Sequence, residues 1–385
     1  MNLVLIFVTV ILVTSCSTAT QYLKGTDNTM QPADLQDFEE VLQLITIWKR
    51  TVGKGPKSLH IKLVPALSGE HIFVATRHGK VSSFNAKTGE KTWESNMDRL
   101  ISGGPGVGSG LVMVGTRDGH VVALSAVEGT LVWSTRMSSE ILSAPQAADG
   151  VVVVRSTDGR LTGLSAITGQ QLWVYEREVP SLTLRGTSNP VISSGIAVAG
   201  FDGGRVVGIS LQAGLPLWET RVAIPTGRSE LERLVDIDGT LQVVDDTIYV
   251  TTFQGRTAAL DLKSGATLWQ RDMSSYAGLG IDDRAIYITD EDSHVWAIDR
   301  GSSASIWRQN KLFARKLTAP VSIGEFIAVG DFEGYIHILN RENGAMVARE
   351  QIDSDGIFSA PIVGDQTLYV YSRAGKLSAL KLSVR

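Results

Sequence analysis

Hydrophobic and polar residues alternate in short segments along most of the chain, and glycine turns separate the segments. Three segments rich in β-branched residues are 72–76, 112–116 and 248–252. A tight turn follows, typified by Asp118-Gly119, because Asp-Gly supplies the positive φ that hairpin turns require. Another alternating segment comes next, such as 120–124, and it ends in a second glycine turn. Alternation with a period of two predicts β-strands joined by hairpins.

A longer period groups these strands. Four times a proline is followed fourteen residues later by a glycine and, after fourteen more, by a tryptophan. The four triplets are Pro65, Gly79, Trp93; Pro105, Gly119, Trp133; Pro145, Gly159, Trp173; and Pro190, Gly204, Trp218. Three later copies keep the spacing with substitutions: Leu241, Gly255, Trp269; Leu279, Ser293, Trp307; and Pro320, Gly334, Ala348. An eighth begins at Pro361 and Gly375, and Trp48 supplies the tryptophan that this copy lacks.

A repeat of about 40 residues that closes on itself is typical of a β-propeller. We therefore expect an all-β fold over residues 41–385, an eight-bladed β-propeller of four-stranded antiparallel blades. Pairing of the N- and C-terminal strands would close the ring. The alternative is seven blades with 361–385 as a tail, which would leave the hydrophobic strand 367–371 at an unpaired edge.

Two adjacent connections between repeats are long, at residues 174–189 and 219–240. Connections of this kind all lie on one face of a propeller, so these two should be neighbours in space. Loops that exceed the need of the repeat are common places for binding sites. The repeated tryptophans are instead expected to pack between blades, because a buried indole removes a large apolar surface from water.

The N-terminus has the pattern of a lipoprotein signal. Residues 3–13 form an apolar run too short to span a bilayer as a helix. The run ends at Val13-Thr14-Ser15-Cys16, which resembles a bacterial lipobox. We expect removal of 1–15, acylation of Cys16, and a flexible tether over 16–40, with a short helix able to form over 37–44. Several acyl chains anchor a protein stably, and Ser17 favours the periplasmic face of the outer membrane.

Composition excludes several classes of protein. The net charge of -4 lacks the excess of basic residues that is typical of nucleic-acid-binding proteins. Cys16 is the single cysteine, so no intramolecular disulfide forms. The glycine-rich run 103–110 lacks the lysine and the spacing of a phosphate-binding loop. The acidic run 290–292 and the six histidines lack the spacing of metal ligands. We expect no metal, no cofactor and no catalytic residues.

The two long connections carry the most distinctive residues of the chain. The first contains Leu182, Leu184, Arg185 and Gly186 within a polar stretch, and the second contains Asp236 and Asp238. One interpretation is that both segments simply pack on the propeller. The other is a protein-binding patch, since aliphatic side chains with arginine and nearby carboxylates are typical of interaction surfaces.

At these residues the chain resembles the BamB family, eight-bladed lipoproteins of the outer-membrane β-barrel assembly machinery. Its Leu-x-Leu-Arg-Gly and Asp-x-Asp segments match the two motifs named above. The resemblance implies a non-enzymatic scaffold that binds the POTRA domains of BamA within the Bam complex and assists assembly and insertion of β-barrel proteins. Unfolded outer-membrane proteins are a further partner that the resemblance allows. It also implies a lipid-anchored location at the periplasmic face of the outer membrane.

Two other functions stay open at this point. The pattern Ala-x-Asp-x-x-x-Gly-x-x-x-Trp, which runs from Ala259 to Trp269, is similar to the propeller motif of quinoprotein dehydrogenases that hold pyrroloquinoline quinone. Those enzymes need longer chains, and many have adjacent cysteines. The second alternative is a lipoprotein whose propeller binds cell-wall or surface polysaccharide.

Overall fold

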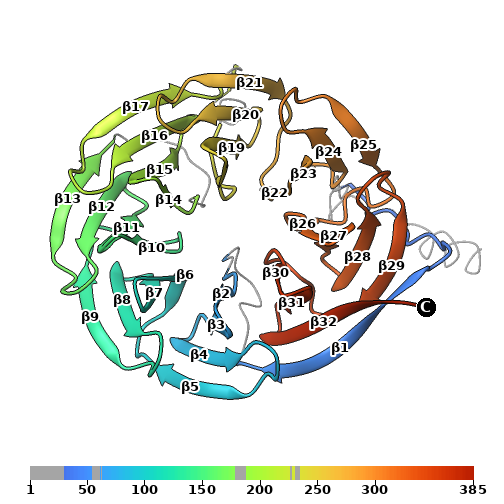
Figure 1. The fold of residues 1–385 in the computed structure, drawn as a ribbon, viewed down its shortest axis with the longest axis horizontal. Helices are drawn as coiled ribbons and strands as arrows, with labels where there is room; N and C mark the ends of the chain where they lie inside the picture. Colours follow the sequence, from blue (N-terminus) through green and yellow to red (C-terminus); the bar gives the residue numbers. More distant parts are fainter. Residues whose placement is uncertain (1–29, 54–60, 62, 178–187, 226–227, 230–234) are drawn as a thin grey trace, which may run out of the picture.

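The structure is a computed structural model, and it describes residues 30–53, 61, 63–177, 188–225, 228–229 and 235–385. Eight four-stranded antiparallel sheets surround a central axis (Figure 1). The expected all-β, eight-bladed propeller is therefore confirmed. No helix occurs among the described residues, so none there can cross a membrane.

The strands follow one order in every blade, from an inner strand to an outer strand. Blades 1 to 4 consist of β2 (Ala66–Ser68), β3 (His71–Ala75), β4 (Lys80–Asn85) and β5 (Lys91–Asn96); β6 (Ile101–Gly108), β7 (Leu111–Thr116), β8 (His120–Ser125) and β9 (Leu131–Arg136); β10 (Gln146–Ala148), β11 (Val151–Arg155), β12 (Arg160–Ser165) and β13 (Gln171–Glu176); β14 (Val191–Ser193), β15 (Ile196–Phe201), β16 (Arg205–Ser210) and β17 (Pro216–Arg221). Blades 5 to 8 consist of β18 (Gln242–Val244), β19 (Thr247–Thr251), β20 (Arg256–Asp261) and β21 (Thr267–Asp272); β22 (Leu279–Ile281), β23 (Ala285–Thr289), β24 (Val295–Asp299) and β25 (Ser305–Gln309); β26 (Val321–Ile323), β27 (Phe326–Gly330), β28 (Tyr335–Asn340) and β29 (Met346–Gln351); β30 (Ile362–Gly364), β31 (Thr367–Tyr371), β32 (Lys376–Val384) and β1 (Leu42–Thr51).

Blade 8 is built from both ends of the chain. Strand β1 pairs antiparallel with β32, from Leu42 opposite Val384 to Thr51 opposite Lys376. Figure 1 shows the two strands side by side at the edge of the ring. Closure by the terminal strands, which the place of Trp48 predicts, is thus confirmed.

The hydrophobic core lies between the blades. Buried side chains form eight clusters, and each cluster joins the facing sides of two adjacent blades. The cluster between blades 3 and 4, for example, joins Val151, Val153 and Trp173 to Ala197 and Phe201. Since every blade needs both neighbours to bury its two faces, the ring is stable only when it is closed.

The repeated tryptophans link each blade to the next. Every indole Nε1 of the set donates a hydrogen bond of 2.7 to 3.0 Å to a backbone carbonyl of the following blade. The pairs are Trp48 to Ala86, Trp93 to Ala126, Trp133 to Ala166, Trp173 to Leu211, Trp218 to Leu262, Trp269 to Arg300 and Trp307 to Arg341. Their role is structural, because these side chains lie in outer strands, away from the central axis.

A glycine beneath the indole makes this contact close. Gly169 has a φ of +70°, and a Cβ there would lie 2.6 Å from Trp133 of the preceding blade. No larger residue fits between the turn and the ring without a shift of one of them. The glycine turn and the tryptophan of neighbouring repeats therefore form one unit.

Replacing Trp133 with alanine should lower the free energy of unfolding by about 3–5 kcal/mol, because a large buried side chain is lost and a cavity remains. Leu131→Ala on the same strand is the matched control, since Leu131 is 63% exposed; it should change the free energy by no more than about 0.5 kcal/mol. Guanidinium unfolding followed by tryptophan-independent far-UV circular dichroism measures both. Equal losses in the two variants would show that the tryptophan does not join the blades.

The exception at Ala348 has a physical reason. In blade 8 the third and outer strands belong to opposite ends of the chain, so no hairpin turn joins them to accept an indole from blade 7. Ala348 is instead buried with Leu42 and Leu380. The N–H of Val41 donates to the carbonyl of Val347 at 3.1 Å, so the incoming chain covers this seam.

The segment before β1 differs from the expected tether. Residues 37–41 have no regular secondary structure and 42–44 lie in β1, so the helix expected over 37–44 is wrong. Arg315 donates to the carbonyl of Ala33 at 3.0 Å, and Arg349 donates to that of Gln36 at 3.1 Å. Leu35 packs against the cluster between blades 6 and 7. These tertiary contacts, which lack any sequence period, hold residues 33–41 on the propeller.

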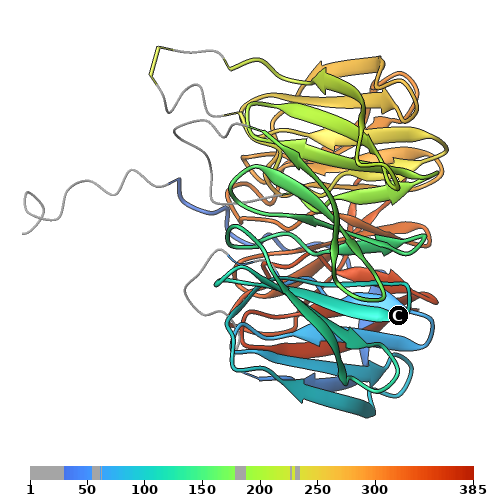
Figure 2. The same ribbon diagram turned by 90° about the vertical axis from the view of Figure 1, so that its left-hand side faces the viewer.

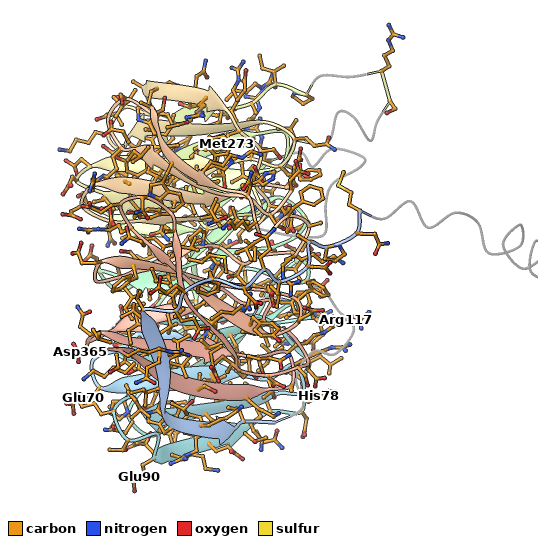
Figure 3. The ribbon with its side chains drawn as sticks, turned by 90° about the vertical axis from the view of Figure 1, so that its right-hand side faces the viewer. Glu70, His78, Glu90, Arg117, Met273 and Asp365 are labelled. Carbon is orange, nitrogen blue, oxygen red and sulfur yellow. The ribbon has the colours of Figure 1, made fainter. Side chains whose placement is uncertain are left out.

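The two faces of the ring carry different segments. The connections between blades and the turns between second and third strands share one face, here called the connection face. The N–H of Met97, in one connection, donates to Gly79 of such a turn at 2.8 Å. Figure 3 shows His78 and Arg117 on this face and Glu70, Glu90 and Asp365 on the opposite face.

Candidate protein-binding site

The predicted site residues fall partly outside the described structure. Leu182, Leu184, Arg185 and Gly186 lie outside the described residues, as does Cys16. Asp236 and Asp238 are described, together with the segments that flank both long connections. Figure 2 shows those flanking segments on the same side of the ring as residues 30–41, the described segment that precedes β1. The site is therefore built here from the ends of the two connections.

The first connection ends at a fixed point. The hydroxyl of Ser188 is fully buried and donates to the carbonyl of Gly200 in β15 at 3.2 Å. The side-chain oxygen of Asn189 accepts a hydrogen bond of 2.7 Å from the N–H of Ala144. These contacts attach the end of the connection to blades 3 and 4.

The end of the second connection also contacts blade 4, at the turn that follows β15. The carboxylate of Asp236 accepts a hydrogen bond of 3.3 Å from the N–H of Gly203, and its carbonyl accepts one of 2.9 Å from Phe253. Ile237 is buried in the cluster between blades 4 and 5. Asp236 is only 2% exposed, whereas Asp238 is half-buried. Asp236 thus attaches the end of the second connection to blades 4 and 5.

Gly200 is where the two ends meet. A Cβ at this position would lie 2.4 Å from Cγ2 of Ile237 and 3.0 Å from Oγ of Ser188. The absence of a side chain lets both segments approach one backbone position. The described ends of the two long connections are therefore neighbours, as their adjacency in the ring predicts.

A buried arginine lies beneath the junction. Arg155, the last residue of β11, is 1% exposed. Its Nη2 is 3.3 Å from Oδ1 of Asp202 and its Nη1 is 3.4 Å from Oγ of Ser188. The guanidinium also lies 4.9 Å from the centre of the Phe201 ring. One side chain therefore contacts residues from the first connection and from blade 4.

The electrostatics of this junction are those of a buried ion cluster. Burial lowers the pKa of Arg155, and the carboxylates of Asp202, Asp238 and Asp236 oppose that effect. Burial likewise raises the pKa of Asp202, against the effect of Arg155. Opposite charges that leave water together stay ionised only when they remain close. The cluster therefore couples blade 3 to the second connection as well as to the first.

A hollow on the connection face lies beside this cluster. It is lined by side chains that include Tyr175, Arg177, Asp202, Arg205, Arg221 and Pro225. Arg177 and Arg205 both donate to Glu219, Arg177 at 2.6 Å. Arg177 and Pro225 immediately precede the undescribed parts of the two connections. An arginine-rich hollow between two long connections suits a protein partner better than a small substrate.

Other candidate sites have structural explanations. Asp290 accepts hydrogen bonds from His294 and from the indole of Trp296, within its own blade. The glycine-rich run lies mostly in β6, where a Cβ at Gly106 would lie 1.7 Å from the carbonyl oxygen of Pro145. Its glycines thus admit the backbone of the next blade. No group of three or more potential metal ligands occurs among the described residues.

The quinoprotein-like pattern also builds a turn. Asp261 accepts hydrogen bonds from the N–H and the hydroxyl of Ser264, at 2.8 and 2.6 Å. Gly265 has a φ of +69° and lies under the indole of Trp218. Trp269 bonds to the next blade. The aspartate, glycine and tryptophan of the pattern therefore each have a function in blade construction.

Sequence reasoning missed Arg155. The residue four before the repeated glycine is Ala75, Gly115, Gly200, Thr251, Gly330 or Tyr371 in other blades, and only blade 3 has a charged residue there. That exception within an apolar strand, Val151–Arg155, was the available signal.

Comparisons with known proteins agree on one family. A family model described as "Outer membrane protein assembly factor BamB" matches residues 77–309. The protein of that name from Pseudomonas aeruginosa is 48% identical over 350 residues, which cover 91% of this chain and 92% of the relative. The one from Legionella pneumophila is 38% identical over 381 residues and 99% of both chains.

Solved structures give the same result. The crystal structure of BamB from Moraxella catarrhalis superposes with a TM-score of 0.80 at 29% identity, and it covers 88% of this chain and 100% of that chain. A quinohemoprotein alcohol dehydrogenase from Comamonas testosteroni has a TM-score of 0.71 at 13% identity, covering 88% of this chain and 76% of that chain, which is a likeness of fold alone. The chain belongs to the BamB family of outer membrane protein assembly factors.

Proposed function

We propose that the protein is a non-enzymatic scaffold of the outer-membrane β-barrel assembly machinery that binds the POTRA domains of BamA. Leu182, Leu184, Arg185 and Gly186 form the contact together with Asp238, and Asp236 supports it from below the surface. Membership in a family named for outer-membrane protein assembly supports the general role. The observation that carries the site is the meeting of both long connections at Gly200.

The mechanism of such a scaffold is binding, without bond making or breaking. Leu182 and Leu184 would provide apolar burial on binding, while Arg185 would give directional hydrogen bonds. The rigid ring fixes the bases of both connections, which lowers the entropy lost on association. The Bam complex would thereby gain a fixed surface beside BamA, where unfolded outer-membrane proteins are further candidate partners.

Affinity capture from solubilised outer membranes tests this function. Tagged full-length protein should recover BamA together with other members of the Bam complex. The recovered amount should not fall in a high-salt wash, because salt screens charge interactions and leaves apolar contacts intact. A tagged unrelated lipoprotein of the same membrane is the control. Recovery of BamA no greater than with that control would refute the proposed partner. Specific retention on cell-wall polysaccharide instead would favour the alternative function.

Lipid attachment is proposed at Cys16, with signal residues 1–15 removed and the protein held at the periplasmic face of the outer membrane. Wild-type protein should incorporate labelled palmitate, and Cys16→Ala should not. The variant should also be lost from the outer-membrane fraction, and be found as soluble protein or as a precursor with an uncleaved signal, because it lacks the acyl chains that give stable attachment. Ser17→Ala is the control and should keep the label. Label in the Cys16 variant would contradict the proposal.

A further inference from the structure

Arg155 is an unusual residue for its place in the fold. The same repeat position in the other seven blades holds Ala, Gly, Thr or, in blade 8, Tyr371. A charged side chain there is buried at the end of an otherwise all-valine strand. Its Nε has no hydrogen-bond partner among the described residues, and its hydrogen bonds to Asp202 and Ser188 are long, at 3.3 and 3.4 Å. This geometry is poor for stability alone.

A buried ion pair is weak evidence for stability, because the loss of hydration offsets much of the Coulomb attraction. Well-packed apolar residues often serve as well. Such a cluster does, however, favour one arrangement of the segments that carry the charges. Here those segments are the end of the first connection, at Ser188, the turn at Asp202 and Gly203, and the end of the second connection, where Asp236 accepts a hydrogen bond from Gly203.

We propose that Arg155 is a positioning residue for partner binding: it holds the ends of both long connections in one fixed arrangement. This inference rests on the proposed function, since the connections are the proposed contact with BamA. Arg155 itself does not touch the partner, because it is buried beneath the junction. Its effect on binding would pass through Ser188 and the Asp236–Asp238 segment.

Blade 7 offers a matched control. Arg315 is 3% exposed and lies 2.8 Å from Asp331, which is fully buried. This pair also joins a blade-to-blade connection to the turn of the following blade, as Arg155 and Asp202 join blades 3 and 4. It lies at another seam of the ring, away from both long connections (Figure 1). Arg315 also donates to Ala33, so loss of its pair should perturb the fold at least as much as loss of the Arg155 pair, while only the latter affects the site.

The experiment compares charge-neutral double variants, Arg155→Met with Asp202→Asn and Arg315→Met with Asp331→Asn, so that neither arginine is removed while its paired aspartate stays charged and buried. Affinity of the full-length protein for the periplasmic part of BamA is measured by interferometry in detergent. Hydrogen exchange of peptides covering 188–193 and 235–241 is measured on the same samples. The first variant should bind at least tenfold more weakly and exchange faster in both peptides. The second should bind within about twofold of wild type.

Arg155→Lys separates charge from geometry, because one ammonium cannot reproduce the two divergent contacts of a guanidinium. It should keep the unfolding midpoint closer to wild type than the methionine variant does, yet still bind BamA more weakly. Wild-type affinity in the Arg155→Met, Asp202→Asn variant would overturn the inference and leave the proposed function intact. An equal loss in the blade 7 variant would also overturn it, by showing a general effect of stability. Failure of the wild type to bind would refute the proposed function and the inference with it.

Discussion

Deletion of residues 1–51 is expected to abolish folding of the propeller. The deletion removes β1, so β32 loses its partner along the register from Leu42–Val384 to Thr51–Lys376. It also removes Trp48, whose indole joins blade 8 to Ala86 of blade 1 at 2.9 Å. Loss of one such tryptophan costs about 3–5 kcal/mol, a large part of the roughly 5–15 kcal/mol that stabilises a typical domain. Without the paired strand as well, the closed ring should not persist.

Soluble yield, size-exclusion chromatography and far-UV circular dichroism measure this outcome. The shortened chain should aggregate, because an unpaired edge strand and apolar blade faces become exposed. Deletion of residues 1–29 is the control and should leave a soluble monomer, since the contacts at Ala33, Gln36 and Val41 remain. A soluble, cooperatively unfolding monomer that lacks β1 would contradict closure by the terminal strands.

The double variant Leu184→Ala with Arg185→Ala is expected to lower affinity for BamA by about 30-fold or more. Truncation of a central interface side chain typically costs 2 kcal/mol or more, and each 1.4 kcal/mol is about a factor of ten. The unfolding midpoint should stay close to wild type, because the end of the connection is held by Ser188 and Asn189 and does not depend on the two substituted side chains. Isothermal titration with the periplasmic part of BamA gives the affinity.

Leu172→Ala is the control for this variant. Leu172 is 52% exposed on the outer strand β13, so it tests whether any exposed leucine of the same blade contributes. Its affinity should equal that of wild type. A loss in the Leu172 variant, with none in the double variant, would move the contact from the connections to the rim of the ring.

Most of the fold could be predicted from the sequence because a propeller repeats one local unit. The spacing of proline, glycine and tryptophan encodes a strand order that each blade realises independently, and Trp48 revealed the circular closure. The same regularity made two connections stand out as too long. The features that the repeat does not predict depend on contacts between residues that are distant in the sequence. The docking of residues 33–41 comes from Arg315 and Arg349, which no period places there.

The candidate site was predictable only in part, for a related reason. The position of Asp236 and Asp238 near the first connection follows from blade order, and the meeting of Ile237 and Ser188 at Gly200 agrees with it. Burial of Asp236 does not follow from the motif, because it depends on Gly203 and Phe253 of neighbouring blades. The role of Arg155 was not predicted from the sequence, because its partners come from two other segments of the chain.

Site-specific photocrosslinking in intact cells tests whether the long connections on the connection face bind BamA. A photoreactive residue is placed at position 184 or 238, and at Glu70 or Asp365 on the opposite face as controls (Figure 3). The account predicts an adduct with BamA from 184 and 238 and none from 70 or 365. Adducts from the opposite face, with none from 184, would contradict it.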